Sequence, residues 1–258
     1  MSGAVALLAG GSLPLAGRLG VAMTLLQFGI GIVNDVVDAP RDAGRKPGKP
    51  IPAGLMTVAA ARTAAVASFT AGTLVGFTVS PNVGVLALVV IAIGLVYDLL
   101  LKGTAWSWLP FAVGIPILPV FGWLGATGTL HPLFAVLLPV AVLAGAALAI
   151  GNALVDVERD RGAGISSIAV ALGADRAAAT GVALVAAVWV LAASSAVVAG
   201  AAWPAIVAVA GVGVVPLIAT FSAVRASTSA RRERLWQVEA VGLAGLAAAW
   251  LTAVLGRL

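Results

Sequence analysis

The sequence predicts an all-α, polytopic membrane protein of about nine transmembrane helices. The 258-residue chain is 61% hydrophobic, and its mean hydropathy is +1.11. Only 10% of its residues are charged, against roughly 25% in soluble domains. Long apolar runs also follow one another along most of the chain, and a helix needs ~20 apolar residues to cross the hydrocarbon core.

Eight of these runs are long enough to cross a membrane as helices, and short polar or Gly- and Pro-rich connections separate them. The predicted helices are Ala16–Val37, Val58–Val79, Val83–Leu101, Trp106–Ala126, Pro132–Val155, Ala177–Ala199, Trp203–Val224 and Val238–Leu255. A ninth run, Val5–Leu15, is short and contains Gly10, Gly11 and Pro14. We interpret it as a further helix that is either abbreviated or missing its beginning.

The basic residues indicate how these helices are oriented. With nine spans, four connections face one side, namely Asp38–Thr57, Lys102–Ala105, Glu158–Arg176 and Arg225–Gln237. These connections and the adjoining helix ends contain all of the 15 basic residues except Arg18 and Arg257. Cytoplasmic loops carry such an excess of Lys and Arg. This side is therefore predicted to be cytoplasmic, in a multi-pass protein of the cell inner membrane.

Composition also excludes several classes of function. The chain has no cysteine, which excludes disulfides, thiolate metal sites and cysteine nucleophiles. Its formal charge of +5 is explained by membrane topology, so we expect no nucleic-acid partner. The N-terminus has no basic n-region, so a cleaved signal peptide is not expected.

Two acidic motifs end two of the apolar runs, both on the predicted cytoplasmic side. The pattern N-x3-D-x3-D begins at Asn34 and again at Asn152. Carboxylates on apolar helices cost ~2.5–3.5 kcal/mol each at a bilayer centre and usually mark function. Six of the ten acidic residues lie in these two windows, namely Asp35, Asp38, Asp42, Asp156, Glu158 and Asp160. The chain is predicted to be one transmembrane domain, 1–258, with two pseudo-repeats of about 1–126 and 127–258.

The spacing of each motif predicts a metal site. Positions i, i+4 and i+8 lie roughly on one face of a helix, so the carboxylates should converge. Like charges this close repel one another. Mg²⁺ prefers oxygen ligands and typically bridges a few carboxylates to substrate phosphates. We therefore predict a metal–polyphosphate site at the membrane–water boundary.

Two residues depart from this geometry. Pro40 lies between Asp38 and Asp42, and is expected to kink or end the helix so that Asp42 lies on a loop or a new turn. Glu158 lies off the face of the second motif, where it either contributes to the site or is solvated. The alternative interpretation of all these acids is ion pairing with nearby Arg and Lys at the lipid surface.

Basic residues lie close to the acidic motifs in the sequence. Arg45, Lys46 and Lys49 follow the first motif in a proline-rich loop, and Lys102 ends an apolar helix one turn after Tyr97. Lys and Arg both suit diphosphate recognition. No acidic motif accompanies a further group of arginines, which we interpret as topology determinants, namely Arg225, Arg231, Arg232 and Arg234.

Together these motifs resemble the UbiA superfamily of intramembrane prenyltransferases. The resemblance is carried by N-D-V-V-D-A-P-R-D at 34–42, K-P-I-P-A-G at 49–54, Y-x4-K at 97–102 and N-A-L-V-D-V-E-R-D-R-G-A-G-I-S-S-I-A-V-A-L-G at 152–173. It implies nine helices around a central cavity with a lateral opening to the lipid. It also implies transfer of a prenyl group from an isoprenyl diphosphate to an acceptor, with Mg²⁺ as cofactor.

The resemblance also implies a role for each matching residue. The implied metal ligands are Asn34, Asp35, Asp38, Asp42, Asp156 and Asp160. The implied diphosphate-binding residues are Arg45, Lys46, Lys49, Lys102 and Arg161. Tyr97 and Asn152 are implied to position the substrate. Asp35, Asp38 and Asp156 are the implied catalytic residues, with Asp35 the candidate base for the acceptor. Lys49 stands where relatives usually have Arg, and Gly103 where many have a second basic residue.

The motifs leave several functions open. The acceptor can be an aromatic ring, a chlorin, a glycerol phosphate or a sugar phosphate. A terpene cyclase on the same fold would need no acceptor. A cation-coupled transporter also suits repeats and intramembrane acids, although here the acids lie at helix ends. The expected partners are an isoprenyl diphosphate, an unidentified acceptor and membrane lipid.

Overall fold

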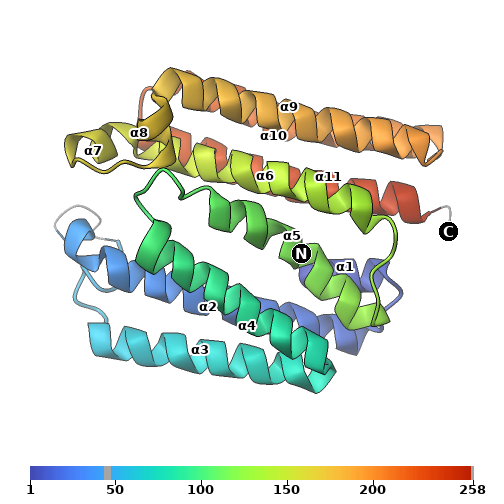
Figure 1. The fold of residues 1–258 in the computed structure, drawn as a ribbon, viewed down its shortest axis with the longest axis horizontal. Coiled ribbons are helices and arrows are strands. Elements are labelled where there is room, and N and C mark those ends of the chain that lie inside the picture. Colours follow the sequence, from blue (N-terminus) through green and yellow to red (C-terminus); the bar gives the residue numbers. More distant parts are fainter. Residues whose placement is uncertain (44–47, 257–258) are drawn as a thin grey trace. The chain divides into compact units, whose positions relative to one another are not determined.

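The protein is all-helical. Its structure, a computed structural model, describes residues 1–43 and 48–256, and within these ranges it contains helices and no strand. The helices form two compact units, and their order along the chain can be followed in Figure 1. The helical fold class predicted from composition is confirmed.

The first unit comprises Met1–Leu101 and Ile117–Leu130. Its helices are α1 (Ser2–Leu8), α2 (Leu13–Asp42), α3 (Val58–Val79), α4 (Pro81–Val96), the π-helical turn η1 (Tyr97–Leu101) and the part of α5 (Leu109–Thr127) from Ile117 onward. Helices α2, α3 and α4 lie alongside one another (Figure 1). Thr57 caps α3 and Ser80 caps α4, because each side chain accepts a hydrogen bond from a backbone N–H of the first turn.

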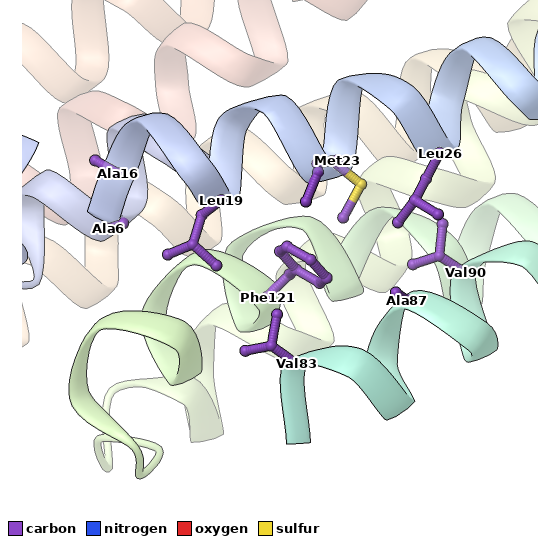
Figure 2. Close-up of a cluster of buried hydrophobic side chains, with 10 residues drawn as sticks. Ala6, Ala16, Leu19, Met23, Leu26, Val83, Ala87, Val90 and Phe121 are labelled. Atoms are coloured by element: carbon purple, nitrogen blue, oxygen red, sulfur yellow. The ribbon is translucent and has the colours of Figure 1, made fainter. Parts of the chain in front are cut away.

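A hydrophobic core joins four helices of the first unit, α1, α2, α4 and α5 (Figure 2). Phe121 of α5 is completely buried and lies between α2 and α4. From α2, Leu19, Met23 and Leu26 point toward it at intervals of three and four residues, the spacing of one helix face. Val83 and its neighbours on α4 close the other side. This core packs against the first half of α2. The last turns of the same helix carry the first acidic motif.

The second unit comprises Lys102–Pro116 and His131–Leu258. Besides the start of α5, its helices are α6 (Phe134–Val155), α7 (Val157–Gly162), α8 (Ile168–Leu172), α9 (Ala174–Val198), α10 (Trp203–Val224) and α11 (Ser229–Leu255). Helix α9 packs on α6 and α10, and α11 packs on α10 and α6. Two indole N–H groups form hydrogen bonds between helices, from Trp189 of α9 to the Ala210 carbonyl of α10 and from Trp250 of α11 to the Ser195 hydroxyl of α9, both at 2.9 Å.

The helices have the lengths and surfaces of membrane spans. In the described part of the chain, eight helices are long and apolar enough to cross a membrane. Large apolar side chains such as Phe28, Leu74 and Ile218 are exposed on them, as expected where lipid replaces water as the solvent. The chain is therefore an integral membrane protein. The predicted number of nine helices is approximate, because the run Val5–Leu15 is divided between the seven-residue α1 and the start of α2.

Candidate functional site

The first acidic motif lies on the last turns of α2. The helix continues through Pro40 and ends at Asp42, so the prediction that Pro40 ends the helix and leaves Asp42 on a loop or a new turn is wrong. A proline this close to the end removes only one backbone hydrogen bond of the last turn, which limits its effect. Asp42 therefore keeps its place one turn after Asp38, and it is only 4% exposed.

One ammonium group lies among three carboxylates of this motif. Lys49 Nζ is 2.7 Å from Asp42 Oδ2, 2.9 Å from Asp35 Oδ1 and 3.8 Å from Asp38 Oδ2. Lys49 reaches them from the connection between α2 and α3, where its carbonyl accepts a hydrogen bond from the backbone N–H of Ala53. The fold thus brings together four of the residues that the sequence singled out.

The electrostatics of this cluster favour a charged Lys49. Burial by itself lowers the pKa of an ammonium group. Hydrogen bonds to Asp42 and Asp35, together with their negative charges, outweigh burial and hold the pKa of Lys49 above its usual value. The lysine therefore serves as an internal counter-ion for the motif.

The oxygen atoms around Lys49 suit a divalent cation. They belong to carboxylates, the ligands that Mg²⁺ prefers, and they already surround one positive charge. Among the described residues, however, no three Asp, Glu or His side chains are arranged so that they could hold one metal ion. The donors fit Mg²⁺ in chemistry, while their present geometry is that of an ion-paired cluster.

Asp98 is a fourth carboxylate close to the first motif, and sequence reasoning missed it. It lies in η1 directly after Tyr97, is only 4% exposed, and accepts a hydrogen bond from Asn34 Nδ2 at 2.7 Å. The signal in the sequence was an acidic residue at the end of a long apolar run. It was overlooked because Asp98 is isolated, whereas the other acids were found by their clustering.

The second motif lies at the junction between α6 and α7. Helix α6 ends at Val155, and Asp156 interrupts the helix with φ −113° and ψ 12°. The prediction that Asn152, Asp156 and Asp160 follow one another on a single helix is therefore wrong. The chain keeps a helical turn across the break, because the Asp160 N–H donates to the Asp156 carbonyl at 2.8 Å.

Arginine side chains pair with the acid at this break and with the next acid along the chain. Arg159 donates to Asp156, three residues away. Arg232 of α11 forms a two-pronged pair with Glu158, with N–O distances of 2.9 and 2.8 Å, and also donates to the Leu154 carbonyl at 3.2 Å. The hydrogen bond from Arg232 lowers the pKa of the Glu158 carboxyl below its usual value. Arg232 therefore does more than determine topology, and Glu158 is not merely solvated.

Helix α11 contacts α6 at two further points, on the turns of α6 that precede the second motif. Trp236 donates its indole N–H to the Leu148 carbonyl at 2.9 Å. One turn further, the Glu239 carboxyl is 1% exposed and lies close to Thr220 of α10. A Cβ atom at Gly151 would lie 3.3 Å from Glu239 Oε2, so the glycine leaves room for this buried acid. Sequence reasoning missed Glu239 because it is the single acidic residue of the predicted run Val238–Leu255.

The remaining predicted residues are distributed as follows. Tyr97 begins η1, Lys102 follows η1, Asn152 lies on α6 and Arg161 on α7, whereas Arg45 and Lys46 lie outside the described residues. Gly103, found where a second basic residue was expected, has φ +75°. A Cβ there would lie 3.1 Å from Ile165 Cγ2. A lysine or arginine would therefore be strained at this turn.

The sequence profile of the UbiA prenyltransferase family matches residues 1–255, almost the whole chain. The chain belongs to the UbiA prenyltransferase family. The resemblance drawn from the acidic motifs is thereby confirmed. No curated protein sequence matches the chain.

Solved structures agree with this membership of the UbiA family at the level of the fold. A digeranylgeranylglyceryl phosphate synthase is 13% identical, with a TM-score of 0.73 over 99% of this chain and 92% of its own. A UbiA homologue from Aeropyrum pernix K1 is 17% identical, with a TM-score of 0.75 over 96% and 93%. A UbiA homologue from Archaeoglobus fulgidus, solved with GPP and Mg²⁺, is 18% identical, with a TM-score of 0.68 over 96% and 94%.

The acidic cluster of each motif includes a cation from this chain. The cluster on α2 contains Lys49, and the cluster at the α6–α7 junction contains Arg159. Both cations come from within a few residues of the motif or from its following loop. In each cluster the chain itself thus supplies part of the positive charge that faces the carboxylates.

Proposed function

We propose that this UbiA-family protein is an intramembrane prenyltransferase that moves a prenyl group from an isoprenyl diphosphate to a lipophilic or aromatic acceptor. The observation that carries the proposal is the convergence of three α2 carboxylates on one cationic atom, Lys49 Nζ. Family membership and the Archaeoglobus fulgidus homologue solved with GPP and Mg²⁺ support it.

The proposed Mg²⁺ ligands are the residues of the two motifs. In the first motif they are Asn34, Asp35, Asp38 and Asp42, and in the second Asp156 and Asp160. When bound, Mg²⁺ would neutralise the diphosphate and stabilise the negative charge that develops as it departs. Lys49 is already held beside the first motif, and we propose that it binds a diphosphate oxygen. Lys102 and Arg161 are proposed to contribute further positive charge.

The chemistry that follows departure depends on keeping water away. Loss of diphosphate leaves an allylic chain with carbocation character, which a nucleophilic acceptor captures. Asp35, with 36% of its side chain exposed, is the more accessible of the α2 carboxylates paired with Lys49, and we propose it as the base that takes a proton from the acceptor. Apolar helix surfaces exclude water and so protect the cation from hydrolysis.

Product analysis tests this proposal. Detergent-purified protein is incubated with Mg²⁺, prenyl diphosphates of different chain length and a panel of aromatic, glycerol phosphate and sugar phosphate acceptors, and products are identified by mass spectrometry. A prenylated acceptor is the expected product. A cyclised hydrocarbon formed without acceptor would replace the transferase proposal with a terpene cyclase. The absence of any product would argue for a transporter or an inactive family member.

A further inference from the structure

Asp98 connects the first motif to a different helix. It lies in η1, a π-helical turn that continues α4 and packs against α2. A π-turn takes up an extra residue and rotates the following side chains relative to an α-helix, and such turns are frequent at functional sites. In this turn the Asp98 carboxylate, almost completely buried, meets Asn34 at the head of the motif.

The hydrogen bond determines which end of the Asn34 amide points away from Asp98. An ionised carboxylate accepts hydrogen bonds but cannot donate them, so it binds the NH₂ end of an amide. Asn34 Nδ2 donates to Asp98 Oδ1 at 2.7 Å. The carbonyl oxygen of Asn34 is consequently directed away from Asp98. Only this oxygen is a suitable ligand for Mg²⁺, because an amide NH₂ group is not.

We propose that Asp98 is a positioning residue that orients Asn34 for metal binding by the first motif. The inference rests on the proposed function. Partners that hold a metal ligand in its binding orientation typically change metal affinity by 10–100-fold when they are removed. Asp98 acts through Asn34 and is not itself proposed to contact the metal.

The test is a titration of the detergent-purified full chain with Mn²⁺ alone, with bound Mn²⁺ measured by electron paramagnetic resonance. Asp38→Ala shows how much of the signal belongs to the first motif. Asp175→Ala is the matched control, because it removes an exposed acid from the first turn of α9. Thermal unfolding of each variant shows that the titrated protein is folded.

Asp98→Ala is expected to weaken Mn²⁺ binding at the first motif by about 10–100-fold, while Asp175→Ala leaves it unchanged. Asp98→Asn provides a second variant if alanine impairs folding. An asparagine at 98 can donate as well as accept, so it no longer fixes the Asn34 amide, and binding should weaken again.

The double variant Asn34→Asp with Asp98→Asn reverses the polarity of the hydrogen bond. The amide at 98 can then donate to a carboxylate at 34, which leaves the second carboxylate oxygen available for the metal. Recovery of most of the Mn²⁺ affinity is expected. A purely structural role for Asp98 would lower the thermal midpoint without changing the affinity of folded protein, and that result would overturn the inference.

Failure of the inference can be distinguished from failure of the proposed function. If wild type binds Mn²⁺, Asp38→Ala removes that binding and both Asp98 variants retain it, the inference alone is wrong. If wild type binds no Mn²⁺, or Asp38→Ala leaves binding unchanged, the first motif is not a metal site. Both proposals then fail.

Discussion

At the scale of single residues, Lys49 acts as the counter-ion of the first motif. Three carboxylates lie within 3.8 Å of its ammonium group, and without it they would repel one another. The same oxygens suit Mg²⁺, so the lysine and a divalent cation neutralise the same charges. The stability of the metal-free protein should therefore depend on Lys49.

Replacing Lys49 by methionine tests this dependence. In metal-free buffer, Lys49→Met should lower the thermal midpoint by about 2–4 °C, which corresponds to ~1 kcal/mol for a chain of this size. Added Mg²⁺ should raise the midpoint of the variant more than that of wild type, because the metal replaces the lost charge. Arg62→Met, which removes an exposed cation from α3, is the control. Equal responses of wild type and Lys49→Met to Mg²⁺ would contradict this role.

Two contacts show what could not be predicted from the local sequence. Asn34 and Asp98 are 64 residues apart, and Glu239 reaches Thr220 on another helix. Their contacts exist only because helices pack, so no spacing rule reveals them. The clustered acids of the first motif were different: a four-residue spacing predicts one helix face, and in α2 that prediction is correct.

At the scale of the helices, α11 anchors the end of α6 through Arg232. Its two-pronged pair with Glu158 holds the short α7 against α11. The pKa of Glu158 is lowered by this contact, so the pair stabilises the fold at pH values above about 4.5, the usual pKa of Glu, and the contribution disappears as pH falls through the lowered value.

Glu158→Gln should therefore lower the thermal midpoint at pH 7. The effect should correspond to less than about 1 kcal/mol, because the Glu158 side chain is 64% exposed and solvent weakens the pair. The difference from wild type should shrink below pH 4.5 and vanish once Glu158 is protonated. A constant difference at every pH would show that the ion pair does not stabilise the junction.

Helix α10 offers a matched pair of glycines for testing close packing. A Cβ at Gly213 would collide with the ring of Trp189, whereas nothing lies within 4 Å of one at Gly211. Gly213→Ala should destabilise by about 1–3 kcal/mol and displace the Trp189 hydrogen bond to Ala210. Gly211→Ala should be neutral or stabilise by up to about 1 kcal/mol. Thermal unfolding and tryptophan fluorescence would report both effects, and similar results for the two variants would argue against this packing.

Helix boundaries were predicted well where apolar runs have clear ends. The runs Val58–Val79 and Trp203–Val224 coincide with α3 and α10, because capping residues or tryptophan and proline mark their starts. The end of the first acidic helix was predicted poorly, because the predicted run stops at Val37 whereas α2 continues to Asp42. The second predicted run ends at Val155, where α6 ends, but the helix that resumes as α7 was not predicted. Pro40 lies too near the end of α2 to break it, and the break at Asp156 has no proline or glycine to signal it.

At the scale of the whole molecule, composition alone was sufficient to predict a helical membrane protein. A chain surrounded by lipid needs apolar helices long enough to cross the bilayer. Eight of the described helices are that long and that apolar. The roles of the site residues and the acceptor depend on a few side chains, which composition does not reveal. The orientation of the helices stays a prediction from the distribution of basic residues.

Cysteine labelling tests that orientation directly, since the chain has no native cysteine. Ser227→Cys and Ala202→Cys place a thiol just beyond opposite ends of α10, at exposed positions. In intact cells, a membrane-impermeant maleimide should label position 202 and leave 227 unlabelled until the membrane is opened. The reverse pattern would place the basic loops, and the acidic motifs with them, outside the cell.

The two acidic motifs are expected to support loss of diphosphate from a prenyl donor. The most direct test is to measure the rate of diphosphate release. Purified wild-type protein with geranylgeranyl diphosphate should release diphosphate only when Mg²⁺ is present. Asp38→Ala and Asp156→Ala should each reduce the rate at least about 100-fold, whereas Asp175→Ala should not. Release that needs no Mg²⁺, or that survives in both motif variants, would contradict the assignment of these carboxylates to the reaction.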